Sequence, residues 1–218
     1  MDETAFLAAL PLERRLALAY APARVRTFWL GLFALDARLG AVVHSAHQPL
    51  LAQIKLAWWR DELNKPPAAR PVGEPLLALI EAWGDQTAGL RALVDGWEVL
   101  LGDAPLDSGA MLQVADARAQ ACASLAARLG LAVAEPEVSR AARGWALAEL
   151  AAALTDPDQQ AEAAGLITQQ DWRRVSLPRE FRPLLVLHGL AARQRGGGPL
   201  IPGPRAGLRA VRLGLLGI

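Results

Sequence analysis

The 218-residue chain contains few of the residue types that build disulfide-rich, zinc-binding and β-sheet proteins. With one cysteine, Cys122, and three histidines it can form no internal disulfide and cannot assemble a Cys/His structural zinc site. Val, Ile and Thr together make up about a tenth of the residues, whereas Ala and Leu make up more than a third. Strands favour β-branched and aromatic side chains, and helices favour Ala and Leu. The composition therefore predicts an all-α protein and excludes a β-sandwich or barrel.

Long apolar runs and the common catalytic motifs are also missing. No uncharged apolar run reaches the roughly 18 to 20 residues needed to span a bilayer, and the opening MDETAFLAAL lacks the basic segment of a secretory signal. No GxxxxGK[ST], GxGxxG, HExxH or CxxC pattern occurs, so nucleotide-binding, zincin and thioredoxin-type functions have no support. We expect a cytoplasmic protein in a reducing compartment, either free or peripherally attached to the inner face of a membrane.

Charge is distributed unevenly along the chain. Residues 1–172 hold 14 basic and 21 acidic side chains, while residues 173–218 hold 9 basic and 1 acidic. Within the segment 199–218, Arg205, Arg209 and Arg212 share one helical face, which predicts a basic amphipathic tail. Its partner is an anionic membrane, a phosphate-bearing ligand or the acidic body of the chain itself. Nucleic acid is not expected, because exposed aromatic residues are not interleaved with the arginines.

Proline and glycine divide residues 1–198 into one domain of helical segments with short connections. Short connections favour antiparallel neighbours and therefore a compact bundle. In the segment that starts at Pro49, the apolar side is assigned to Leu50, Ile54 and Trp58. Residues 155–177 are weakly periodic and predict a loop with one helical turn, and Pro183 is expected to kink or delay the final helix. The expected helices cover 1–20, 24–44, 49–64, 74–83, 88–101, 110–129, 138–154 and a last segment after Pro178.

One part of the chain resembles a known family. The segment 53–60, QIKLAWWR, is similar to the QIRLxWWRxxL helix of the squalene/phytoene synthase family, and residues 31–39 resemble the helix that precedes it. Weaker similarities follow in the family's order at 93–98 (LVDGWE), 123–130 (ASLAARLG) and 172–178 (WRRVSLP). The resemblance covers roughly residues 24 to 180. It implies an isoprenoid-synthase type of all-α bundle, shortened at the C-terminus.

The resemblance also implies an activity and the residues that the activity needs. Members of the family condense two prenyl diphosphates, and two aspartate-rich motifs hold the Mg²⁺ ions that neutralise the diphosphate. The implied alignment places the first motif at residues 40–44, GAVVH, which contain no acid. The second motif keeps Asp156 but has Gln160 at its second acid. One carboxylate cannot hold such a metal cluster, so we expect no cofactor and no prenyl transfer.

Two function classes follow from these observations. The first is a non-catalytic scaffold, assembly or lipid-binding factor with a prenyl lipid or protein partner, similar in kind to the complex I assembly factor of the same superfamily. The second is a divergent phytoene or squalene synthase that transfers farnesyl or geranylgeranyl diphosphate with Mg²⁺ held by other ligands. The sequence does not determine the oligomeric state.

Candidate site residues fall into two groups. A buried carboxylate is costly unless it is paired, so Asp36, which lies beside an apolar stripe, is expected to pair with Lys55 or Arg60. Trp58 and Trp59 differ by about 100° around their helix, so they cannot both face one direction of the core, and one of them either packs on another helix or lines a pocket or partner surface. The candidate remnant of the family's pocket comprises Asp36, Lys55, Trp59, Arg60 and Asp156. The candidate contacts for phosphate or membrane are Arg173, Arg174, Arg205, Arg209 and Arg212.

Overall fold

The computed structural model describes residues 3–45, 48–84, 86–102, 105–131, 134–193 and 213–214. Over these residues the chain forms ten α-helices and no β-strand, which confirms the predicted all-α class. Short 3₁₀ turns lie at Pro67–Ala69, Glu81–Trp83, Val99–Leu101 and Arg179–Phe181. No described helix is both long and apolar enough to cross a membrane. The helices are α1 (Glu3–Ala9), α2 (Leu12–Ala19), α3 (Ala23–His44), α4 (Pro49–Asn64), α5 (Pro75–Ile80), α6 (Ala88–Glu98), α7 (Ser108–Arg128), α8 (Glu135–Ala153), α9 (Pro157–Gln169) and α10 (Arg182–Ala191).

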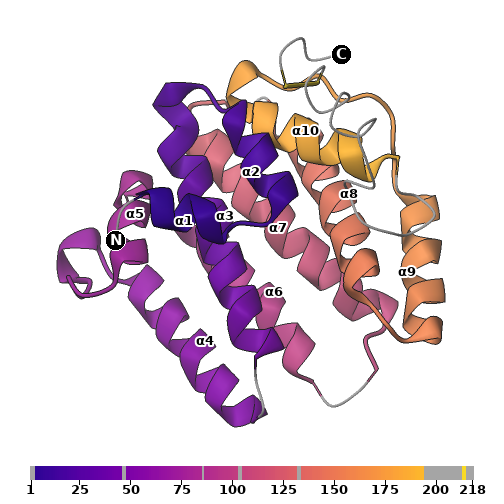
Figure 1. Cartoon of the computed structure of the whole chain (residues 1–218), viewed down its shortest axis with the longest axis horizontal. Helices are drawn as coiled ribbons and strands as arrows, with labels where there is room; N and C mark the ends of the chain where they lie inside the picture. The colour runs from indigo at the N-terminus through magenta and orange to yellow at the C-terminus, as the bar shows by residue number, and fades with distance from the viewer. Residues whose placement is uncertain are drawn as a thin grey trace.

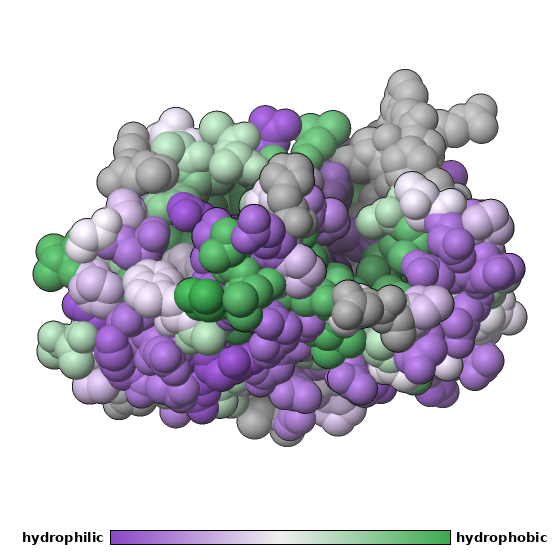
Figure 2. All heavy atoms as spheres, turned by 90° about the horizontal axis from the view of Figure 1, so that it is seen from below, coloured by the Kyte–Doolittle hydropathy of each residue, from purple (hydrophilic) through white to green (hydrophobic). Residues whose placement is uncertain are grey.

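The helices pack as one bundle around α3 and α7 (Figure 1). Helix α7 packs between α6 and α8, and α10 packs on α8 and α2. Helix α4 lies at one edge of the bundle against α6 and α3, while α9 lies at the opposite edge against α8. Seen from below, the side of the molecule where α4 begins shows green apolar side chains among purple polar ones (Figure 2).

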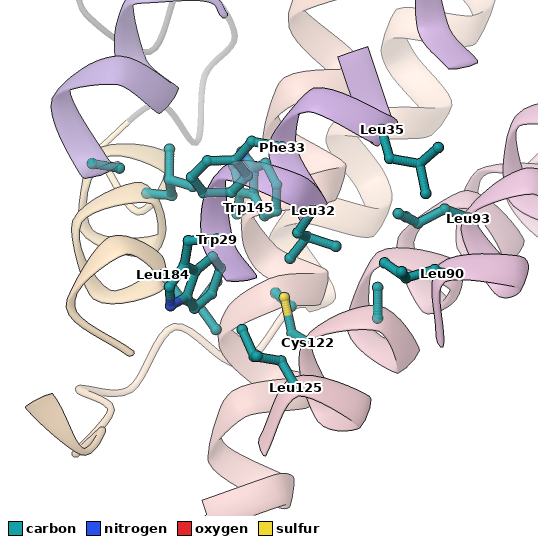
Figure 3. Packing of buried hydrophobic residues seen from close by; sticks show 14 of the residues in the cluster. Trp29, Leu32, Phe33, Leu35, Leu90, Leu93, Cys122, Leu125, Trp145 and Leu184 are labelled. Atoms are coloured by element: carbon teal, nitrogen blue, oxygen red, sulfur yellow. The ribbon is translucent and has the colours of Figure 1, made fainter. Parts of the chain in front are cut away.

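Aromatic rings fill the centre of the bundle. Trp29 and Phe33 of α3 pack with ring centroids 5.3 Å apart, and Phe33 meets Trp145 of α8 at 6.0 Å (Figure 3). Phe181, in the turn before α10, lies 5.4 Å from Trp29 and is fully buried. A cavity beside Cys122, lined in part by Phe33 and Trp145, has a volume of about 10 Å³. That is about the volume one water molecule needs.

Two glycines let α6 and α7 pack closely. A Cβ atom at Gly96 would lie 2.5 Å from the Cβ of Ala117, and one at Gly89 would lie 2.7 Å from the Cα of Ala121. Because the two glycines are seven residues apart, they lie on the same face of α6. Residues with side chains at these positions would push the two helices apart.

The first predicted helix, residues 1–20, is wrong as a single element. The chain forms α1 and α2 instead, with an extended backbone at Pro11 (φ −53°, ψ 151°) between them. Proline has no N–H to donate, so it cannot continue α1, but its fixed φ suits the residue that precedes the first turn of α2.

The predicted loop at 155–177 is also wrong, because residues 157–169 form α9. The carboxylate of Asp156 accepts hydrogen bonds from the backbone N–H groups of Asp158 (3.1 Å) and Gln159 (2.9 Å), and Pro157 occupies the first helical position. Cap and proline together start a helix. Since α9 buries only Ala163 and Ile167, its apolar periodicity is too weak to read from the sequence.

Pro183 was expected to kink or delay the final helix, and the structure shows a delayed start. The helix after Pro178 begins at Arg182, behind a 3₁₀ turn at residues 179–181, and Pro183 lies in its first turn. A proline in a first turn removes no helical hydrogen bond, because that N–H has no partner within the helix.

Candidate functional site

Four charged side chains from four helices meet in the interior. This buried charge cluster consists of Arg14 (α2), Asp36 (α3), Arg118 (α7) and Glu149 (α8). The Arg14 Nη2 atom lies 2.7 Å from Asp36 Oδ2 and 2.6 Å from Glu149 Oε1, and Arg118 Nε lies 3.1 Å from Asp36 Oδ2. Trp97 Nε1 of α6 donates to Asp36 Oδ1 at 2.6 Å. Asp36 therefore has both oxygens engaged and is 2% exposed.

The electrostatics of the cluster are balanced, with two positive and two negative groups. Burial by itself raises the pKa of Asp36, but the positive charges of Arg118 and Arg14 outweigh it and hold that pKa below its usual value. The guanidinium groups of Arg14 and Arg118 also lie 5.3 and 5.2 Å from the ring centre of Trp145, within cation–π range. The cluster is consequently charged at neutral pH and enclosed by aromatic rings.

The predicted partners of Asp36 are wrong. Arg60 turns the other way and donates to Asp95 at 2.8 Å and to Glu98, which joins α4 to α6. Lys55 is exposed. Lys55 lies at the surface beside the end of α3, and the partners of Asp36, Arg14 and Arg118, come instead from helices distant in sequence.

Arg14, Arg118 and Glu149 were not predicted from the sequence, although the sequence contains a pattern that could have identified Arg118. Arg118 lies on the same stripe of α7 as Ala115, Cys122 and Leu125, at steps of three and four residues, and those three are fully buried. A charged residue on a core-facing stripe requires a buried counter-charge. The stripe therefore marks Arg118, whereas nothing in the sequence identifies Asp36 as its partner.

The residues at the implied metal motifs do not fit a magnesium–diphosphate complex. A Cβ atom at Gly40 would lie 2.9 Å from the Trp97 ring, and His44 packs edge-on against the same ring with its Nδ1 atom 2.7 Å from the Gly40 carbonyl oxygen. Asp156, exposed at the edge of the molecule, is occupied as the cap of α9. Among the described residues no three acidic, His or Cys side chains gather in a way that could hold a metal ion.

The candidate phosphate contacts divide between described and undescribed residues. Arg173 is 81% exposed in its side chain and lies 2.7 Å from Asp171, which also binds Arg140 at 2.9 Å. The hydrogen bonds from Arg173 and Arg140 hold the pKa of Asp171 well below its usual value. Arg174, next to this network, is exposed and also has an interaction within the chain. Arg205, Arg209 and Arg212 lie outside the described residues.

A groove between α3 and α4 brings together two residues of the predicted pocket, Lys55 and Trp59. Its volume is about 500 Å³. The other three members, Asp36, Arg60 and Asp156, lie elsewhere. This α3–α4 groove is lined by Arg38, Ala41, Val42, Ser45, Ile54, Lys55, Trp58, Trp59 and Glu74.

The side of α4 that the sequence assigned to the core faces outward. Leu50, Ile54 and Trp58 are 66%, 58% and 38% exposed, and Leu51 beside them is 53% exposed. The inner side of α4 is a second apolar stripe, which consists of Ala52, Leu56, Trp59 and Leu63. Helix α4 is thus apolar on two sides, and its pattern alone does not reveal which side is buried. The outward-facing residues Leu50, Leu51, Ile54 and Trp58 form an exposed apolar stripe.

Comparison with known proteins gives no family for the chain. It matches no family model, no curated protein and no solved structure. The resemblance to the squalene/phytoene synthase family therefore stays a prediction from its motifs.

Proposed function

We propose that this chain is a non-catalytic helical scaffold of the squalene/phytoene synthase type, which acts by binding a lipid or a protein at its surface. The observation that carries the proposal is the position of Trp97. Its ring fills the space beside Gly40, where the resemblance places a metal-binding acid, and its Nε1 donates to Asp36. A tryptophan packed in this way leaves no room for the side chain that the chemistry requires.

The state of the interior carboxylates supports the same proposal. Prenyl transfer needs carboxylate oxygens that are free to bind Mg²⁺ and an apolar chamber that accepts the prenyl chain. Asp36 and Glu149 are instead bound to Arg14 and Arg118, and the cavity beside them has a volume of about 10 Å³. The larger hollow is the α3–α4 groove at the surface, which favours recognition there.

A thermal-shift experiment tests the proposal. The full chain is heated with Mg²⁺ alone, with farnesyl or geranylgeranyl diphosphate alone, and with each diphosphate and Mg²⁺ together. A ligand present at 100 times its Kd stabilises a protein by about 2.7 kcal/mol, which raises the Tm by several degrees. We expect the combination to shift the Tm by no more than the sum of the single additions. A Mg²⁺-dependent rise of several degrees would favour the prenyl-diphosphate enzyme.

A further inference from the structure

The α3–α4 groove has the size and the walls of a small-molecule site. Its volume of about 500 Å³ lies within the range of about 300 to 1,000 Å³ that is typical of ligand pockets. Val42 of α3 forms part of one wall, and Ile54 and Trp58 of α4 form the other. The rings of Trp58 and Trp59 meet edge to face with centroids 5.1 Å apart. These walls suit an apolar chain.

The groove also carries more positive than negative charge. Arg38 enters it from α3 and Lys55 from α4, against the single acid Glu74. The Nη2 atom of Arg38 lies 4.0 Å from Glu74 Oε1, an oxygen that already accepts the N–H of Leu76 at 3.1 Å. Lys55 is exposed and forms no ion pair with any residue that the structure describes. An anionic group between the two helices would complement Arg38 and Lys55.

The apolar surface continues beyond the groove toward the start of α4. Leu50, Ile54 and Trp58 follow one another at four-residue spacing, so they lie on one face of the helix. Ile54 and Trp58 line the groove, and Leu50 extends the same strip outward with 66% of its surface exposed. The site therefore combines two cations with an elongated apolar strip, a polarity that suits a chain with one charged end.

We propose that the α3–α4 groove binds one single-chain anionic lipid of the fatty-acid class. Its carboxylate lies between Arg38 and Lys55, and its hydrocarbon chain follows Trp58, Ile54 and Leu50. This inference rests on the proposed function and names the class of its partner. A neutral lipid of the same length would leave Lys55 without a counter-charge and Arg38 with Glu74 alone, and so binds more weakly.

Binding of oleate below its micellar concentration, measured by titration calorimetry on the full chain, tests this site. The expected result is saturable binding of one oleate per chain, with oleyl alcohol at least tenfold weaker. Ile54→Gln and Lys55→Glu should each weaken oleate binding at least tenfold. Leu12→Gln on α2 is the matched control, since Leu12 is 57% exposed against 58% for Ile54, and it should bind as the unchanged chain does.

A bromine-quenching measurement locates the hydrocarbon chain of the bound lipid independently of those variants. Dibromostearate quenches tryptophan emission on contact, and Trp58 is the tryptophan most exposed in the groove, so at saturating dibromostearate Trp58→Phe should remove most of the quenching. Equal quenching in both proteins would overturn the proposal. Equal oleate binding by Ile54→Gln and Leu12→Gln would do the same.

Two further outcomes separate this inference from its alternatives and from the proposed function. The protein could fail to bind oleate and yet sediment with phosphatidylglycerol vesicles, with less sedimentation for Ile54→Gln. In that case the exposed stripe of α4 contacts a membrane surface, and the groove proposal is overturned. Failure to bind oleate leaves the non-catalytic scaffold standing. Conversely, conversion of a prenyl diphosphate into product would end the scaffold proposal whatever the oleate result.

Discussion

At the scale of single residues, the buried charge cluster makes the sharpest energetic prediction. The substitution Asp36→Leu removes one of the two acids of the cluster, so that two buried arginines, Arg14 and Arg118, share Glu149 alone. Breaking a buried ion pair in this way costs about 3–5 kcal/mol, so the free energy of unfolding in urea should fall by that amount.

The control is the exposed pair of Asp95 with Arg60, which is worth less than about 1 kcal/mol. Asp95→Leu should therefore change the free energy of unfolding by less than that. Equal losses for the two variants would show that the cluster does not stabilise the native state as argued.

The thiol of Cys122 gives a prediction of pH dependence. Burial, with a smaller contribution from the charge of Asp36, raises the pKa of Cys122 from 9.0 to about 12. The unfolded thiol ionises at its ordinary pKa, so the stability that the protonated thiol confers is fully present below about pH 9 and is lost as pH rises toward 12. Each pH unit in that window costs about 1.4 kcal/mol.

Urea unfolding at pH 8, 9 and 10 measures the contribution of Cys122. Cys122→Ala should flatten the decline above pH 9 compared with the unchanged chain. Parallel curves for the two proteins would mean that the thiol ionises as readily in the fold as in the unfolded chain.

The need for a partner at Asp36 could be predicted from the sequence, but not the identity of that partner. A carboxylate beside an apolar stripe must be paired, and Lys55 and Arg60 on the next helix are near in sequence. Arg118 lies 82 residues along the chain from Asp36, and Glu149 lies 135 residues from Arg14. Such distant pairs depend on how the helices pack, which local patterns do not encode.

At the scale of helices, replacing glycine by alanine should have opposite effects on stability at two positions. Gly96→Ala forces a Cβ into Ala117 and should destabilise the protein by about 1–3 kcal/mol. Gly165 in α9 has no atom within 4 Å of an added Cβ, so Gly165→Ala should stabilise it by about 0.5–1 kcal/mol. Thermal unfolding of both variants checks the signs, and a stabilising Gly96→Ala would contradict the close packing of α6 on α7.

Helix positions were more predictable than helix faces. Proline, glycine and the three- and four-residue spacing locate α3, α4, α7 and α8 to within a few residues. Helix α9 was not predicted, because it buries only Ala163 and Ile167 and its apolar spacing is therefore weak. The exposure of Ile54 and Trp58 was not predicted, because α4 has a second apolar stripe and the sequence does not show which of the two is buried. A pattern of apolar residues shows that a helix has an apolar side but does not say what covers that side.

At the scale of the whole molecule, the Ala- and Leu-rich composition predicts a helical bundle. It does not predict whether the interior of that bundle is filled or open. Trp97 is one of the aromatic residues that fill the interior, and it reaches from α6 to Gly40 and Asp36 of α3. Among the described residues, the interior cavity beside Asp36 has a volume of about 10 Å³, whereas the α3–α4 groove at the surface has one of about 500 Å³. This contrast supports the proposal of recognition at the surface rather than chemistry in the centre.

The most direct test of that account is a product assay. Purified full-length protein is incubated with Mg²⁺ and radiolabelled farnesyl or geranylgeranyl diphosphate, and the organic extract is analysed for condensed C30 or C40 hydrocarbons alongside release of diphosphate. The account predicts no hydrocarbon product and no diphosphate release above a reaction without protein. Enzyme-dependent formation of either product would contradict it.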